Sequence, residues 1–156
     1  MAAEQLYKVA YDEAVRALSE QQALIDNVRN RAGLLLSTAA ITTSFLGTQA
    51  LHSGDPGFFA WLALAGFTGV AAASLAVLWP RKWEITASSP DVISTYIESA
   101  KPAPIEELHQ ELSLHMHGSY LLNQKDLEKL FVFFQIASLL LAIEVVLWIV
   151  AIAMSS

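Results

Sequence analysis

Few side chains in this sequence could carry out chemistry, and cysteine is absent from all 156 residues, which excludes disulfides and thiolate sites. His109, His115 and His117 are candidate metal ligands, but the two-residue step from His115 to His117 places them on different helix faces. Zinc sites need at least three converging ligands, and no second cluster complements these histidines. We therefore expect no metal site.

The usual sequence signatures of enzymes are also missing. There is no phosphate-binding loop, no nucleophile elbow with triad partners and no dinucleotide fingerprint. We expect a protein that is not an enzyme, with no catalytic residue and no bound cofactor.

Glu144 is the one ionisable residue within the long apolar runs, about 20 Å along a helix from Phe131 at about 1.5 Å per residue. A carboxyl group at that depth in a membrane is expected to be protonated, hydrogen-bonded or facing water. Matching its depth along the other runs suggests Ser44, Thr48 and Thr68 as its partners. We favour a neutral Glu144 that holds helices together over a pore-lining or proton-carrying role.

Three apolar runs must position these groups, at 33–51, 58–79 and 131–154. Each approaches the roughly 20 residues that cross a bilayer. The chain is 54% hydrophobic and 15% charged, with a mean hydropathy of +0.44. This composition predicts an all-α integral membrane protein of one domain. A soluble bundle is disfavoured because little else could cover three such helices, and a signal peptide because 32 residues precede the first run.

The basic residues predict one orientation in the membrane. All nine lie in two segments, 1–32 and 80–130: Lys8, Arg16, Arg29, Arg31, Arg81, Lys82, Lys101, Lys125 and Lys129. The positive-inside rule places both segments, and so the N-terminus, in the cytoplasm, and the 52–57 turn outside. Four tryptophans fall near the predicted membrane boundaries, where their amphipathic rings are favoured: Trp61, Trp79, Trp83 and Trp148.

The cytoplasmic segments are predicted to be helical. Residues 4–32 carry a heptad seam of Tyr7, Tyr11, Ala14, Leu18, Gln21, Ile25, Val28 and Ala32. This seam either packs on residues 80–130 of the same chain or joins two copies. No Gly or Pro separates it from Gly33, so a continuous helix through the first run is expected.

Further along, a short helix is predicted at 91–100, followed by a break at two prolines. A longer helix is predicted to run into the third apolar run with a stripe of Ile105, Leu108, Leu112, His115, Ser119 and Leu122.

Two of the apolar runs carry small or hydroxyl residues. The second run has Ala65, Gly69 and Ala73 at four-residue spacing, and the first has Ser37, Thr38, Thr42, Thr43, Ser44 and Thr48. Small residues allow close helix contact and hydroxyls can bond across helices, so we expect close packing. A polar lining in an oligomeric pore is the alternative.

The sequence resembles the small membrane effectors of Pycsar antiphage systems, which carry the PycTM domain, and the related SLATT effector domains. The resembling segments are 23–47, ALIDNVRNRAGLLLSTAAITTSFLG; 75–83, LAVLWPRKW; and 121–150, LLNQKDLEKLFVFFQIASLLLAIEVVLWIV. The resemblance covers nearly the whole chain through its layout and diffuse similarity. It implies a cell-killing effector that binds cyclic CMP or cyclic UMP made by a separate cyclase, then assembles and damages the bacterial inner membrane.

A cyclic mononucleotide needs a cation or backbone donors for its phosphate and an aromatic or apolar face for its base. The cytoplasmic candidates for these roles are Arg29, Arg31, Arg81, Lys82, Lys125, Trp83, Tyr96 and Tyr120. Basic residues that flank a membrane also serve as topology anchors and lipid contacts, so this assignment remains one of two interpretations.

Other function classes are compatible with the residues. A constitutive small channel or transporter subunit would use Glu144 and the hydroxyls, and a membrane scaffold would recruit a partner through its N-terminal helix. The net charge of −6 argues against a nucleic-acid partner. Three spans are too few to enclose a wide aqueous path, so membrane damage would require a homo-oligomer in the lipid bilayer.

Overall fold

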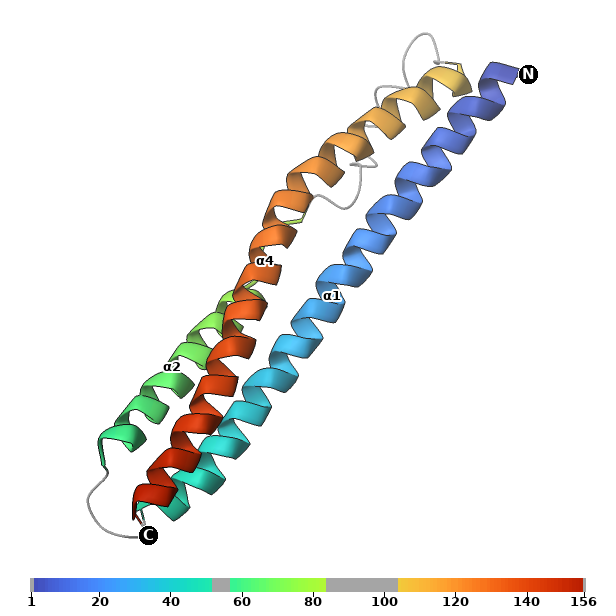
Figure 1. Ribbon diagram of the computed structural model, residues 1–156. Helices are drawn as coiled ribbons and strands as arrows, with labels where there is room; N and C mark the ends of the chain where they lie inside the picture. The colour runs from blue at the N-terminus through green and yellow to red at the C-terminus, as the bar shows by residue number, and fades with distance from the viewer. Residues whose placement is uncertain (1, 52–56, 84–103, 156) are drawn as a thin grey trace. The chain divides into compact units, whose positions relative to one another are not determined.

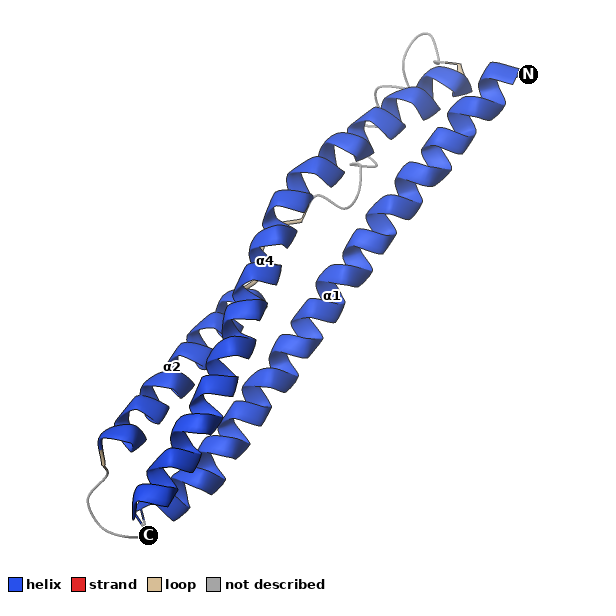
Figure 2. Ribbon diagram, in the orientation of Figure 1, coloured by secondary structure: helices blue, strands red, loops and turns tan. Residues whose placement is uncertain are grey.

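The computed structural model describes residues 2–51, 57–83 and 104–155. These residues form three helices and no strand, which confirms the all-α prediction for this part of the chain (Figures 1 and 2). The helices are α1 (Ala2–Leu51), α2 (Phe58–Leu78) and α4 (Ile105–Ser155). The helix predicted at 91–100 lies outside the described residues.

Helices α1 and α4 are much longer than a membrane requires. They contain 50 and 51 residues, or about 75 Å each at about 1.5 Å per residue. Helix α4 begins directly after Pro104, whose carbonyl oxygen accepts bonds from the backbone N–H groups of Glu107 and Leu108. Two acidic residues in the first turn, Glu106 and Glu107, suit the positive end of the helix dipole. Both predictions of continuity, from the seam into the first run and from 105 into the third, are confirmed.

The chain divides into two compact units, and α1 and α4 contribute to both. The first unit comprises the described residues of Met1–Ile25 and Arg81–Leu127, and the second those of Asp26–Pro80 and Glu128–Ser156.

In the first unit, α1 and α4 run parallel. The rings of Tyr11 and His109 stack with centroids 5.3 Å apart and an interplanar angle of 27°. Further along the same two helices, Gln21 Nε2 donates a hydrogen bond to the backbone oxygen of Tyr120 over 3.1 Å. Leu18 and Ile25 are buried on the same face. The seam of α1 therefore packs within its own chain, which favours the first of its two predicted roles.

The stripe predicted for the first half of α4 is only partly correct. Ser119 is buried, but Ile105, His115 and Leu122 are exposed, and Asn123 and Leu127 are buried in their place. The predicted stripe followed the apolar side chains. The buried face instead lies further round the helix, because contacts with α1 through His109 and the Tyr120 carbonyl set its rotation.

In the second unit, α2 runs antiparallel to α4, whereas α1 runs parallel to it. Gly66 and Gly69 of α2 lie against Glu144 and Leu140 of α4 in reverse order. A hydrophobic cluster draws on all three helices: Ala50 from α1, Ala60 and Ala63 from α2, and Trp148 from α4.

Helices α2 and α4 are long and apolar enough to cross a membrane. Only 22% and 17% of the residues in their most apolar stretches are buried in the protein. The core helix of a soluble bundle is buried on most sides, so this exposure favours contact with lipid. The first predicted run, 33–51, is not one of these two helices among the described residues.

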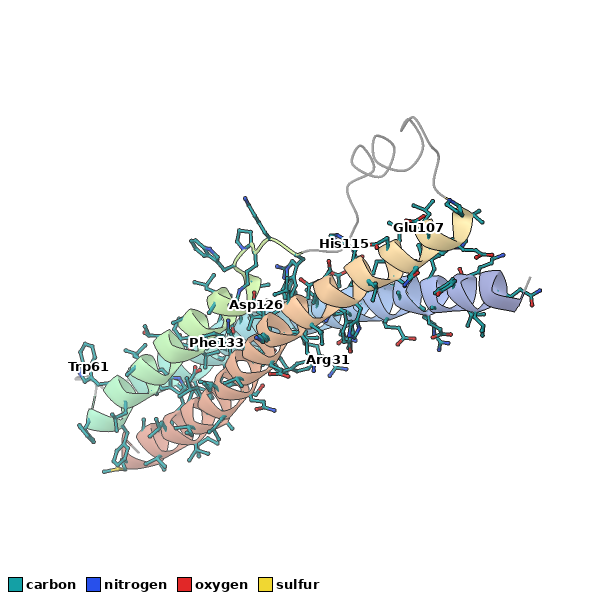
Figure 3. The ribbon with its side chains drawn as sticks, turned by 90° about the horizontal axis from the view of Figure 1, so that it is seen from above. Arg31, Trp61, Glu107, His115, Asp126 and Phe133 are labelled. Atoms are coloured by element: carbon teal, nitrogen blue, oxygen red, sulfur yellow. The ribbon has the colours of Figure 1, made fainter. Side chains whose placement is uncertain are left out.

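Two of the tryptophans predicted to lie near membrane boundaries are exposed. Trp61 and Trp79 stand near opposite ends of α2 and are 62% and 68% exposed. The side chain of Trp61 extends outward from α2 (Figure 3). Such exposed rings suit the interface between lipid and water.

Candidate functional site

The candidate site lies in the second unit, around the carboxyl group of Glu144. Glu144 is completely buried, and Thr43 Oγ1 on α1 donates a hydrogen bond to its Oε1 atom. Of the three states expected for this carboxyl group (protonated, hydrogen-bonded or facing water), the structure shows the hydrogen-bonded one. The bond links the α1 and α4 helices directly.

The donor is not one of the three partners that depth suggested. Ser44 is exposed, whereas Thr48 Oγ1 donates to the backbone oxygen of Ser44 over 2.6 Å. Thr68 Oγ1 likewise donates to the backbone oxygen of Leu64 over 2.9 Å. Depth is nearly the same for Thr43 and Ser44, but one residue rotates a helical side chain by about 100°, so only Thr43 faces α4.

Other hydroxyls of the first run also bond within α1. Ser37 and Thr38 donate to the backbone oxygens of Gly33 and Leu34, four residues earlier. In bonds of this kind an exposed hydroxyl group finds a hydrogen-bond acceptor without water. The exposed hydroxyls on α1 therefore do not demand an aqueous pore.

Glycines set how closely the helices approach the site. A Cβ atom built on Gly66 would lie 3.3 Å from Glu144 Cβ, and one on Gly69 would lie 2.9 Å from Leu140 Cδ1. A side chain at Gly66 would press on the Cβ of Glu144, and one at Gly69 would require the end of the Leu140 side chain to move. The predicted small-residue face is therefore correct at Gly69 and at the buried Ala73, but Ala65 is exposed and takes no part.

Trp148 lies one turn beyond Glu144 on α4 and is completely buried in the bundle. Its ring fits against α1 because Gly47 has no side chain there: a Cβ on Gly47 would lie 3.2 Å from the ring. The indole Nε1 and the Glu144 Oε2 atom are both buried without a hydrogen-bond partner of good geometry.

The arrangement supplies one carboxyl group, one hydroxyl and one indole N–H. The described residues contain no group of three side chains that could hold a metal ion. The arrangement around Glu144 can hold the three helices in a fixed register. The importance of Thr43 was visible in the sequence only as one of six hydroxyls in the first run.

The predicted nucleotide-binding residues are divided between the two units. Arg29 and Arg31 belong to the second unit, and Arg31 is exposed on α1 (Figure 3). The others belong to the first unit: Arg81, Lys82, Trp83, Tyr120 and Lys125. Tyr96 lies outside the described residues. Lys82 and Lys125 are exposed, while Arg81, Trp83 and Tyr120 are half-buried.

No protein-family model, curated protein sequence or solved structure matches this chain.

Proposed function

We propose that this protein is a membrane effector of a Pycsar-like bacterial antiphage system. Cyclic CMP or cyclic UMP, made by a separate cyclase during infection, binds its cytoplasmic part and causes it to oligomerise. The oligomer impairs the inner membrane, and the infected cell dies before the phage multiplies. The signal and the outcome come from the resemblance to PycTM effectors.

One observation carries this proposal from the structural side. Helix α4 is uninterrupted from Ile105 to Ser155, and its residues belong first to one unit and then to the other. The first half bears charged residues and the second half is apolar and bears Glu144. A ligand that acts on the first half therefore acts on the same continuous helix whose second half is apolar.

The proposed protein crosses the membrane three times, and the second half of α1 makes the first crossing. That half is less apolar than α2 and α4, but Thr43 and Gly47 lie against Glu144 and Trp148 of α4. A segment that packs along a membrane-spanning helix must share its depth in the bilayer. Helix α2 runs in the opposite direction, which fits an up-down-up arrangement.

The proposed orientation places the N-terminus in the cytoplasm of the bacterial cell. All nine basic residues precede the first span or lie between the second and third, and the positive-inside rule then decides the direction. The cytoplasmic segments would thereby meet a nucleotide made inside the cell.

Oligomerisation needs a surface other than the heptad seam. Leu18, Gln21 and Ile25 are buried within the first unit, so contacts between copies must use faces that remain exposed. Ligand can drive assembly only if it binds the assembled state more tightly than the monomer.

The test uses purified full-length protein in detergent and in dye-loaded vesicles. Cyclic CMP or cyclic UMP should bind, shift the protein to larger species and release the dye, whereas cyclic AMP should have none of these effects. Arg31→Ala and Lys125→Ala should weaken the response, and Lys8→Ala, at another exposed basic position, serves as the control.

If neither cyclic CMP nor cyclic UMP binds, the effector proposal is refuted. Dye release that is equal with and without nucleotide would favour a constitutive channel.

A further inference from the structure

Glu144 occupies a position where all three helices of the second unit meet. It accepts a hydrogen bond from Thr43 on α1, and its Cα and Cβ atoms lie against Gly66 on α2. No part of the side chain is exposed. The arrangement of α1, α2 and α4 around this residue is therefore sensitive to what the carboxyl group binds.

The same arrangement leaves two polar groups poorly satisfied. Glu144 Oε2 and Trp148 Nε1 are buried with no partner of good hydrogen-bond geometry, and Gly47 holds the indole in place from the α1 side. Unsatisfied polar groups in an apolar surrounding oppose the state that contains them. The Thr43 hydrogen bond favours this packing. The Trp148 indole is close enough to the Glu144 carboxyl group to interact with it, but without a hydrogen bond of good geometry. Both groups therefore favour any packing that would satisfy them better.

We propose that the Thr43–Glu144 hydrogen bond is a latch: it holds the three membrane helices in a packing that keeps the membrane impermeable (the seal) until a signal breaks the bond. This inference rests on the proposed effector function and adds its regulation. Release separates Thr43 from Glu144 and gives the Glu144 and Trp148 polar groups access to water or to another copy. Both helices joined by the latch also extend through the first unit, where the signal would bind.

The test compares variants of the full-length protein in dye-loaded vesicles without nucleotide. Thr43→Val keeps the shape of the side chain and removes the donor, so dye should escape roughly two- to tenfold faster than with wild type, the range that one net hydrogen bond gives. Thr43→Ser retains the hydroxyl donor, so vesicles with this variant should stay as impermeable as those with wild type. Thr38→Val makes the same chemical change at an exposed position of α1 and should leave the seal intact.

A thermal double-mutant cycle on Thr43→Val and Glu144→Leu tests the bond separately from leakage. The two changes should be coupled, with a combined loss of stability smaller than the sum of the single losses. Independent, additive losses would overturn the latch. A coupled pair in which Thr43→Val remains as well sealed as wild type would overturn it as well.

The latch and the proposed signal fail in different ways. Coupling together with leakage from Thr43→Val supports the latch even if cyclic CMP and cyclic UMP have no effect on the wild type. In that event the nucleotide proposal alone is refuted.

Discussion

Gly47 on α1 faces the ring of Trp148 on α4, and a Cβ atom at position 47 would lie 3.2 Å from Trp148 Cη2. The absence of a side chain on one helix thus creates the space for the largest side chain on the other. This pair explains why an indole lies inside the bundle, although its position near the end of an apolar run suits the membrane interface.

Replacing Gly47 should destabilise the protein through that contact. Gly47→Leu overpacks the site and is expected to cost about 1–3 kcal/mol, since the completely buried ring has little room to move. Thermal unfolding in detergent measures the change. Gly33→Ala is the control: a Cβ there meets nothing within 4 Å, so about 0.5–1 kcal/mol of stabilisation is expected from helix propensity. Equal melting temperatures for the two variants would contradict the packing described.

Trp148 and Trp61 should respond very differently to removal. Trp148→Ala leaves a cavity in the bundle and is expected to cost about 3–5 kcal/mol, whereas the ring of Trp61 is 62% exposed and Trp61→Ala should cost much less. Chemical denaturation in mild detergent compares them. A smaller loss for Trp148→Ala than for Trp61→Ala would contradict the burial of the indole.

Glu144 should act through hydrogen bonding more than through charge. Glu144→Gln retains an oxygen that can accept the bond from Thr43, so assembly and membrane activity should be kept. Glu144→Leu removes the acceptor and leaves the Thr43 hydroxyl without it, so helix packing should change. Size-exclusion chromatography and dye release distinguish the two. Loss of activity in Glu144→Gln with assembly intact would favour a protonation role.

The heptad seam of α1 should form part of the core of each single chain. Ile25 is 2% exposed and Val15 is 42% exposed. Ile25→Asp buries an unpaired charge and should cost about 3 kcal/mol or more, with early proteolysis of the first unit. Val15→Asp on the same helix should be tolerated. If Ile25→Asp blocks only oligomerisation and leaves the protease resistance of the monomer unchanged, the seam joins copies instead.

The proposed orientation can be tested with single cysteines, since none has to be removed first. Gly57 and His117 are both exposed positions. In intact cells an impermeant thiol reagent should label Gly57→Cys and leave His117→Cys unlabelled until the cells are opened. The reverse pattern would invert the topology, and labelling of both would contradict the arrangement of spans.

The amino-acid sequence alone determined that the chain is helical, where its apolar runs lie and that both long helices are continuous. These properties are local: no Pro interrupts 2–51, Pro104 marks the start of α4, and apolar runs are visible without a partner. The side of the membrane that each segment faces also follows from the sequence as a prediction, because it depends on counting Lys and Arg.

Tertiary structure decided which face of each helix is buried and which residue meets which. Thr43 and Ser44 have nearly the same depth and chemistry, and only the packing of α1 on α4 selects Thr43 as the donor to Glu144. The same holds for Trp148, whose burial depends on Gly47 about a hundred positions earlier. Helical periodicity places a side chain within a turn, but its partner depends on the rotation and approach of a second helix, which no local pattern contains.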